Sequence, residues 1–189
     1  MKLRNLVSKL KSVLFYPLRF KYFGNGSLIV APLKIDGSKN IIIGKHVYVQ
    51  AQTWLACVPL TGGKNPTLKF GDGCVIGHFN HIYATQSIVF EANVLTADRV
   101  YISDNLHNYT DINTPIVQQP ICQINPVVIG EGSWLGENVC IIGASIGKHC
   151  VIGANAVVTR DIPDYSVAVG VPARVIKQYN FETEQWETK

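Results

Sequence analysis

One histidine stands outside the repeating pattern of this chain and has the chemistry of a base. His107 is the only histidine in the segment DNLHNYTDINTPIVQQPICQINP, residues 104–126. The ordinary pKa of its side chain, about 6.5, lets either ring nitrogen accept a proton near neutral pH. A long irregular segment inside a compact domain is more often functional than idle. The position of His107 therefore makes it a candidate functional residue.

The positive charge of the chain is modest and scattered. Its 189 residues carry a formal net charge of +4 and contain no long run of Lys and Arg interleaved with aromatic residues. Such runs are typical of proteins that bind nucleic acids, so a nucleic-acid partner is not expected. A phosphorylated small molecule needs only a few cations placed together, and this chain could bind one.

The rest of the chain carries a repeat with a period of six. In IGKHCVIGANAVV, which begins at Ile146, the pair Ile-Gly returns after six residues, a period that fits neither a helix nor a simple strand. Bulky residues lead these hexads in five groups of three. The leaders are Ile43, Val49 and Leu55; Phe70, Ile76 and Ile82; Phe90, Thr96 and Ile102; Ile129, Leu135 and Ile141; and Ile146, Ile152 and Val158.

This repeat predicts an all-β fold, a parallel β-helix in which three hexads form one triangular coil. A single coil cannot bury its own apolar face, so stacked coils share one core. An ordinary β-sandwich is the alternative, but alternating strands would not place a glycine directly after so many leaders. These glycines are Gly44, Gly71, Gly77, Gly130, Gly136, Gly147 and Gly153.

The segment IGEGSWLGENVCIIGASIGKHCVIGANAVVTRDIPDYSVAVGVPARVI, residues 129–176, resembles the hexapeptide-repeat acyltransferases. Within that superfamily the likeness is to sugar and polysaccharide O-acetyltransferases, related to galactoside and maltose acetyltransferases, and it extends over residues 40–178. The resemblance implies a left-handed β-helix, an exception to the usual right-handed crossover rule. It also implies a homotrimer that binds acetyl-CoA between subunits and needs no metal.

The resemblance implies acetyl transfer from a thioester to a sugar hydroxyl, with His107 as the base. Many relatives carry a second histidine two or three residues earlier, where this chain has Asp104 and Asn105. Asp104 is a candidate to hold the far ring nitrogen of His107 and to lie beside the acceptor, although an Asp in a loop more often forms a turn. Asn80 either contacts the acceptor or forms hydrogen bonds inside the core.

The same resemblance places the cofactor on the C-terminal coils. The pantetheine arm is expected to pass Gly136 and Ala154, with Trp134 beside the thioester or at a subunit contact. Polar and basic side chains of TRDIP and ARVIK are expected to meet the phosphates, because Arg and Lys suit phosphate by bidentate and point-charge contacts. These residues are Thr159, Arg160, Arg174 and Lys177. The alternative for them is a solvated charged rim.

The remaining histidines are weaker candidates. His78 and His81, in HFNH, could join His107 in a metal site of the kind found in carbonic anhydrases built on this helix. Their spacing and order do not match that three-histidine arrangement, so no metal is expected. His46 and His149 are expected to be solvated at turns.

The ends of the chain are expected to lie outside the repeat, which is assigned to residues 24–178. Residues 1–23 combine helically spaced Leu and Val with Lys and Arg, and predict an amphipathic helix that either caps the first coil or lies on an anionic membrane. Residues 179–189 are expected to be a loose polar tail. The five cysteines, with no metal-ligand spacing, suggest reduced thiols and a cytoplasmic protein, which could lie at the inner face of the membrane.

The expected function is therefore acetyl-CoA-dependent O-acetylation of a sugar hydroxyl in the synthesis of a surface polysaccharide. One alternative is N-acetylation of a nucleotide-linked amino sugar. Relatives with that activity often have an N-terminal nucleotide-binding unit, for which the short lead of this chain has no room. A second alternative is a scaffold without catalysis, against which the loop histidine and the basic C-terminal pairs argue.

Overall fold

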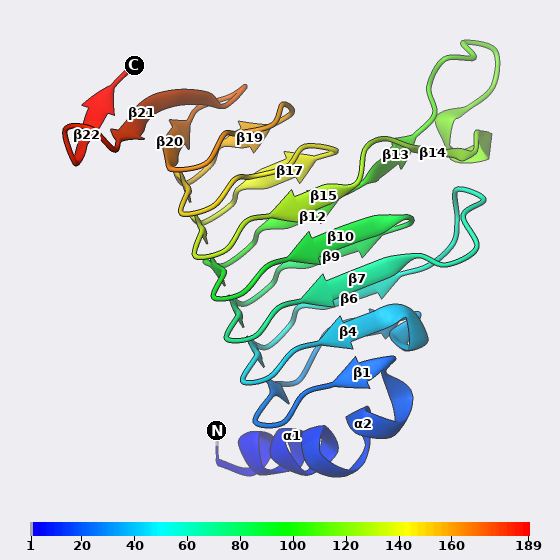
Figure 1. The fold of residues 1–189 in the computed structure, drawn as a ribbon. Helices are drawn as coiled ribbons and strands as arrows, with labels where there is room; N and C mark the ends of the chain where they lie inside the picture. The colour runs from blue at the N-terminus through cyan, green and yellow to red at the C-terminus, as the bar shows by residue number, and fades with distance from the viewer. Residues whose placement is uncertain (1) are drawn as a thin grey trace.

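A computed structural model describes residues 2–189, with side chains from Leu6 onward. Its strands wind into a three-sided prism, and each side of the prism is one sheet (Figure 1). The first side, sheet A, consists of β1 (Tyr22–Phe23), β4 (Ile41–Ile43), β7 (Thr67–Phe70), β10 (Ser87–Phe90) and β15 (Val127–Ile129).

The second side, sheet B, is the longest. It contains β2 (Leu28–Ile29), β5 (Tyr48–Val49), β8 (Val75–Ile76), β11 (Leu95–Thr96), β16 (Trp134–Leu135), β18 (Val151–Ile152), β20 (Ser166–Val169), β21 (Arg174–Asn180) and β22 (Gln185–Thr188). Sheet C contains β3 (Lys34–Asp36), β6 (Trp54–Cys57), β9 (His81–Ala84), β12 (Tyr101–Ser103), β17 (Cys140–Ile142) and β19 (Val157–Val158).

The remaining elements lie outside the prism faces. Two helices, α1 (Lys2–Leu14) and α2 (Tyr16–Arg19), cover its N-terminal end. A projecting hairpin, β13 (Asn105–His107) and β14 (Ile121–Gln123), leaves the prism after β12. Two short 3-10 helices, η1 (Ser38–Asn40) and η2 (Ile116–Gln118), complete the structure.

From β1 to β20 the chain visits the sheets in the order A, B, C and advances one coil per circuit, so neighbouring strands of these coils are parallel within each face. The path in Figure 1 turns as a left-handed helix. The predicted left-handed parallel β-helix is confirmed. Short strands joined by sharp corners favour a β-helix, because each corner turns the chain directly from one sheet into the next with no helix between them.

The core confirms the hexad pattern residue by residue. All fifteen predicted leaders are at most 2% exposed, and leaders of successive coils stack directly on one another. Ile82, for example, pairs in register with Leu55 below and Ile102 above. The rings of Phe70 and Phe90 stack in the same way, 4.7 Å apart. Each leader therefore buries its neighbours as well as itself, which single coils cannot do.

Two partial coils extend the predicted set. Phe23, Ile29 and Ile35 form a first coil that also keeps the period of six, and Ile162 and Ala168 continue the last one. Among them only Phe23 is followed by glycine. The pattern of a leader followed by glycine therefore misses most of these end residues.

The C-terminal tail differs from the prediction. Residues expected to be loose form β22, which pairs antiparallel with β21, and β21 in turn pairs with β20. Aromatic contacts hold this hairpin, since the ring of Tyr179 lies 5.6 Å from that of Trp186 and 5.1 Å from that of Phe181. Aromatic residues spaced along a polar tail were the available signal, because such cross-strand pairs stabilise hairpins.

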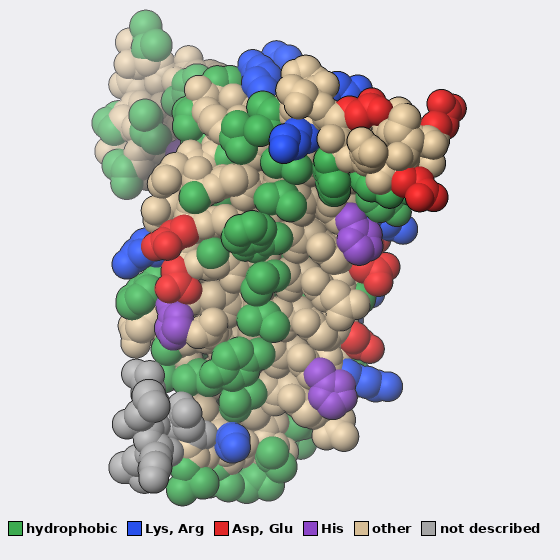
Figure 2. Space-filling view, turned by 90° about the vertical axis from the view of Figure 1, so that its left-hand side faces the viewer, with side chains coloured by type: hydrophobic (Ala, Val, Ile, Leu, Met, Phe, Trp, Pro, Cys, Tyr) green, Lys and Arg blue, Asp and Glu red, His purple; other side chains and the backbone are tan. Residues whose placement is uncertain are grey.

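The outer surface of sheet B carries one continuous apolar row. Its members are aligned by strand register and are Leu28, Tyr48, Val75, Leu95, Trp134, Val151 and Val167. Figure 2 shows hydrophobic side chains along the length of this face. Contiguous apolar surfaces are a common feature of contacts between protein molecules.

Candidate active site

The hairpin of β13 and β14 presents His107 to solvent. His107 pairs with Ile121 across the hairpin, and the next residue, Asn108, donates its backbone N–H to the carbonyl of Pro120 at 3.0 Å. The His107 side chain is exposed, at the base of a loop that extends beyond the prism (Figure 1). The predicted base therefore lies where a substrate can reach it.

The root of this hairpin is a fully buried carboxylate. One oxygen of Asp104 accepts hydrogen bonds from the backbone N–H and hydroxyl of Thr85, at 2.8 and 3.0 Å. The other accepts the backbone N–H groups of Gln86 and Ser87, at 2.8 and 2.7 Å. The side-chain amide of Asn105 adds a third donor to the first oxygen, at 3.0 Å. Five donors thus fix the point where the loop leaves the coil.

A second layer of polar contacts ties both hairpin strands to the prism. The amide of Gln123, on β14, donates to the carbonyl of Asp104 at 2.6 Å. Its oxygen accepts the hydroxyl of Thr61 at 2.6 Å and shares the proton of the Thr85 hydroxyl with Asp104, at 2.9 Å from that hydroxyl. Ser103 donates its hydroxyl to the carbonyl of Asn105 at 2.6 Å. This network holds the loop root in a single arrangement, although only Asp104 was singled out in the sequence.

The prediction for Asp104 is therefore corrected. Both carboxylate oxygens bond to the coil below, and the side chain is 0% exposed, so it neither orients the ring of His107 nor meets an acceptor in this arrangement. The physical reason is the corner geometry. A carboxylate that turns inward at a loop root finds free backbone N–H groups there, and these bond it more strongly than an exposed ring nitrogen would.

Asn80 follows the core alternative. The two N–H bonds of its amide are shared among the carbonyls of Gly77 and Ala97 and the hydroxyl of Thr96, and its oxygen accepts the backbone N–H of Val100. The side chain is 1% exposed. Every polar atom of Asn80 is thus used within the coils, which corrects its assignment as an acceptor contact.

The other two histidines of this region have different surroundings. His78 lies at a corner, where its Nδ1 is 3.3 Å from a carboxylate oxygen of Asp98. His81 points outward from β9, and its ring stacks on Trp54 with centroids 4.2 Å apart. Burial lowers the pKa of His81, and its Nε2 is buried without a hydrogen-bond partner. Within residues 2–189 no cluster of three metal-ligating side chains occurs. His46 and His149 are exposed at turns, as expected.

Sheet C carries an aromatic surface that the sequence analysis missed. Tyr83 and Tyr101 lie beside the His81 ring, at 5.9 and 5.3 Å, and Trp54 donates its indole N–H to Asp36 at 2.9 Å. Flat aromatic faces with a polar rim can stack on sugar rings. The available signal was the position of these residues, each directly before or after an inward leader.

The predicted pantetheine positions lie together. Gly136 is fully buried, and a Cβ there would come within 2.7 Å of the backbone nitrogen of Ala154 on the next coil. Only glycine allows this close approach of two coils. Ala154 is exposed at the corner between sheets B and C, and Trp134 lies two residues before Gly136 on the outer face of sheet B. The structure thus brings the three residues to one edge of the prism.

The predicted phosphate contacts are all exposed but occupy two places. Arg174 and Lys177 lie on β21. The backbone N–H of Ala173 donates to the carbonyl of Val157 on β19, the strand that follows Ala154, so Arg174 lies near that strand. Thr159 and Arg160 follow β19 at the corner between sheets C and A. Arg174 donates to the carbonyl of Ala173 at 2.9 Å.

Comparison with known proteins agrees with this fold. A model of the hexapeptide repeat of succinyl-transferase matches residues 126–160. Galactoside O-acetyltransferase of Escherichia coli is 32% identical over 159 residues, which cover 79% of this chain and 72% of that protein. The chain belongs to the hexapeptide-repeat acetyltransferase family. The predicted resemblance to sugar O-acetyltransferases is confirmed.

Other members of the acetyltransferase family are similar over shorter parts of their length. A probable acetyltransferase of Mycobacterium tuberculosis is 39% identical over 76% of this chain and 52% of its own length. An Escherichia coli protein named for O-acetyl transfer in lipopolysaccharide biosynthesis is 38% identical over 62% of this chain and 64% of its own. The chain thus spans between half and two thirds of these two relatives.

A solved structure has the same fold as this chain. AntD, an N-acyltransferase from Bacillus cereus crystallised with dTDP and 3-hydroxybutyryl-CoA, superposes with a TM-score of 0.74 over 93% of this chain and 89% of its own. Its sequence identity is 18%, so the likeness concerns the fold.

Proposed function

We propose that the chain is an acetyl-CoA-dependent O-acetyltransferase that acetylates a sugar hydroxyl during the synthesis of a surface polysaccharide. The observation that carries the proposal is the loop: a buried five-donor root holds a hairpin whose strand ends on the exposed His107. The names of its family relatives, which include galactoside O-acetyltransferase, support the reaction class. A rigid root beneath an accessible imidazole is what a positioned base requires.

In the proposed reaction a ring nitrogen of His107 takes the proton of the acceptor hydroxyl while the hydroxyl oxygen attacks the thioester carbonyl carbon. The carbon–sulfur bond then breaks, and the departing thiolate receives the proton from the imidazolium. The products are a sugar ester and free CoA, and His107 is restored. Because one side chain serves as base and then as acid, no covalent enzyme intermediate is needed.

The cofactor is proposed to lie along the edge formed by Gly136 and Ala154, with Trp134 beside it. Close coil contact at Gly136 leaves a smooth edge for the pantetheine arm. Arg174 and Lys177 on β21 would bind phosphate, and Thr159 and Arg160, at the corner between sheets C and A, would do so from a neighbouring subunit. CoA in the crystals of structural neighbours such as AntD supports this choice of cofactor.

The arrangement favours a homotrimer with shared sites. The loop with His107 leaves the edge between sheets C and A, whereas Arg174 and Lys177 lie on sheet B, the opposite side of the prism (Figure 1). One chain therefore cannot bring its own base to its own β21 cations. We propose that a neighbouring subunit supplies the base, and that the apolar row on sheet B, which includes Trp134, contributes to subunit contact.

A mixing experiment tests the shared site. His107→Ala and an Arg174→Glu, Lys177→Glu double variant should each be inactive alone. After unfolding and joint reassembly in equal amounts, random mixing leaves about a quarter of the sites with both partners intact. Activity near that fraction supports the shared site. Complete inactivity, with mixed trimers confirmed by native mass spectrometry, would contradict it.

The reaction itself is tested by incubating the full chain with acetyl-CoA and candidate acceptors. Release of the CoA thiol and a mass gain of one acetyl group on the sugar are expected. Mild alkali distinguishes the products, because it removes an O-acetyl ester and leaves an N-acetyl amide. An alkali-stable product from an amino sugar would replace the proposal with N-acetylation. The proposed location is the cytoplasm, where acetyl-CoA and glycan precursors are available together.

A further inference from the structure

The N-terminal helix α1 faces the prism with its polar side. Ser8 and Ser12, one turn apart, are 5% and 4% exposed. Their hydroxyl oxygens accept the backbone N–H groups of Ala31 and Ile29, each at 3.3 Å. These N–H groups belong to the first coil, which has no coil below it to bond. The serines therefore close the open end of the β-helix with hydrogen bonds.

The opposite side of α1 is apolar and faces solvent. Leu10 is 59% and Leu14 61% exposed, and Leu18 on α2 is 85% exposed. The full set of exposed large apolar residues in this segment is Leu6, Val7, Leu10, Val13, Leu14, Phe15 and Leu18. At about 100° per residue, Leu10 lies roughly 160° around the helix from Ser12. A capping helix normally buries its apolar side, and here the order is reversed.

Charge is segregated around the same surface. Lys9 and Lys11 project on either side of the apolar sector, roughly 100° before and after Leu10. Residues 1–24 contain six of the seventeen Lys and Arg residues of the chain and none of its thirteen Asp and Glu residues. The first acidic residue is Asp36. Exposed apolar residues bordered by cations are the pattern of an interfacial membrane helix.

We propose that α1 and α2 bind the surface of an anionic lipid bilayer, with Leu6, Leu10 and Leu14 inserted below the headgroups. A second copy of the chain is the competing occupant of this surface. If the N-terminal ends of two copies met, the six Lys and Arg residues of one would face the six of the other with no acidic residue between them. Anionic lipid headgroups complement this positive charge instead. The described residues include no helix long and apolar enough to span a membrane, so attachment would be peripheral.

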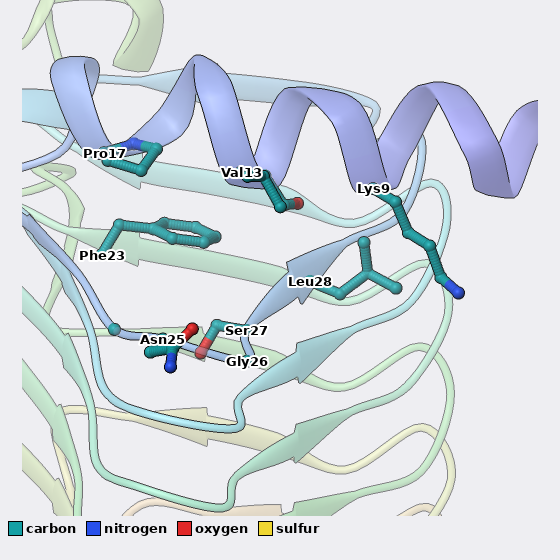
Figure 3. A pocket seen from close by; sticks show the side chains of 10 residues that line it. Lys9, Val13, Pro17, Phe23, Asn25, Gly26, Ser27 and Leu28 are labelled. Carbon is teal, nitrogen blue, oxygen red and sulfur yellow. The ribbon is translucent and has the colours of Figure 1, made fainter.

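The place of α1 on the prism suits this role. The helix lies across the N-terminal end of the β-helix, away from the hairpin and from β21 (Figure 1). A groove of about 510 Å³ separates it from the first coil, and Figure 3 shows Lys9 and Val13 on its helix side with Phe23 and Leu28 across from them. No acidic residue lines the groove, so the Lys9 ammonium stays available to a lipid phosphate.

Trimer formation would strengthen the attachment. In the proposed trimer, on which this step rests, the three prisms run parallel, and their three N-terminal ends face one plane. Three weak surface contacts then act together, which raises the overall affinity well above that of one helix.

Vesicle sedimentation with the full chain tests the proposal. Vesicles of phosphatidylcholine mixed with phosphatidylglycerol should carry the protein down, and pure phosphatidylcholine should do so far less. A Leu10→Glu, Leu14→Glu variant should lose at least tenfold in binding, while Leu60→Glu, Val171→Glu, matched exposed positions elsewhere, should bind normally. Changing Lys9 and Lys11 to Gln should weaken binding to anionic vesicles by about fivefold each and flatten its salt dependence.

Several results would overturn the membrane proposal. One is equal binding by the Leu10→Glu, Leu14→Glu variant and the unchanged chain. Another is an oligomer, seen by light scattering without lipid, that this variant abolishes, because it would assign the surface to a second copy. Turnover of a water-soluble acceptor should be the same in the variants of α1 and in the unchanged chain. Loss of vesicle binding with retained turnover separates a failure of membrane attachment from a failure of the proposed activity.

Discussion

Asp104 and His107 are three residues apart at the foot of the same hairpin and have opposite surroundings. The Asp104 carboxylate is fully buried and accepts five hydrogen bonds from the coil below it. The His107 imidazole is exposed at the far end of β13 and is free to meet a substrate. The chain crosses from the inside of the prism to its outside within one short strand.

This difference shows how the fold assigns work to its polar residues. A polar side chain that turns into the coil has its hydrogen-bonding capacity used by backbone groups, and it then stabilises structure. One that turns outward remains available for chemistry. In the proposed reaction, rigidity at Asp104 would help His107, because a base contributes most when its position is fixed before the substrate arrives.

The largest expected effect separates the two residues by function. His107→Ala should lower turnover by roughly a hundredfold to ten-thousandfold, because a positioned general base contributes about that much. Its thermal midpoint should stay unchanged, since the side chain is exposed. Enzyme assays and thermal unfolding of the same preparation measure both quantities. Near-normal turnover would transfer the role to another residue, with His78 the next to test.

Asp104→Ala should produce the complementary result, a loss of stability. It leaves the backbone N–H groups of Thr85, Gln86 and Ser87 without their acceptor, at a cost of about 3 to 5 kcal/mol in the free energy of unfolding. Asp104→Asn keeps the shape and one acceptor oxygen, and should lose less. Urea unfolding measures the difference. Unchanged stability in Asp104→Ala would break the comparison, because the carboxylate would then not hold the loop root.

Asn80→Ala extends the comparison to a second inward polar residue. Removing its amide leaves the N–H of Val100 and the carbonyl of Ala97 unpaired, which should reduce the free energy of unfolding by about 2 to 3 kcal/mol. The folded fraction should keep its affinity for the acceptor. A raised KM at unchanged stability would instead restore Asn80 as an acceptor contact.

These two inward residues also mark the limit of sequence analysis. The period of six predicted the fifteen leaders from Ile43 to Val158, because burial of a bulky residue on each face is a repetitive demand that leaves a repetitive pattern. It did not predict the leaders of the two partial coils at the ends. Asp104 and Asn80 were identified as candidate site residues. Whether their side chains point into the coil or out to solvent depends on the backbone geometry at the corner, which a single sequence does not give. The reversed orientation of α1 was equally hidden, since its helical period is the same whichever side is buried.

The exposed cations of β21 should show a smaller effect, confined to the cofactor. Arg174→Ala and Lys177→Ala should each weaken acetyl-CoA binding by about 1 to 3 kcal/mol, the value of a charge-assisted hydrogen bond. Lys64→Ala, an exposed lysine far along the chain, is the matched control. Calorimetric titration with acetyl-CoA and with its 3′-dephospho form shows which residue meets that phosphate. Identical binding by all three variants would leave these cations as a solvated rim.

The smallest effect concerns His81, which lies between the two extremes, half-buried against Trp54 with its Nε2 unpaired. Burial lowers the pKa of His81 in the folded protein, so as pH falls through the ordinary value of about 6.5 the unfolded chain takes up a proton first. The stability contributed by the neutral ring is complete above that pH and is lost progressively below it, until the folded protein is protonated too.

His81→Phe preserves the aromatic stack and removes the titration. The thermal midpoint of the unchanged chain should therefore fall more steeply than that of His81→Phe between about pH 7 and pH 5. Acidic groups titrate alike in both proteins, so parallel pH profiles would mean that His81 is as well solvated in the folded chain as in the unfolded one.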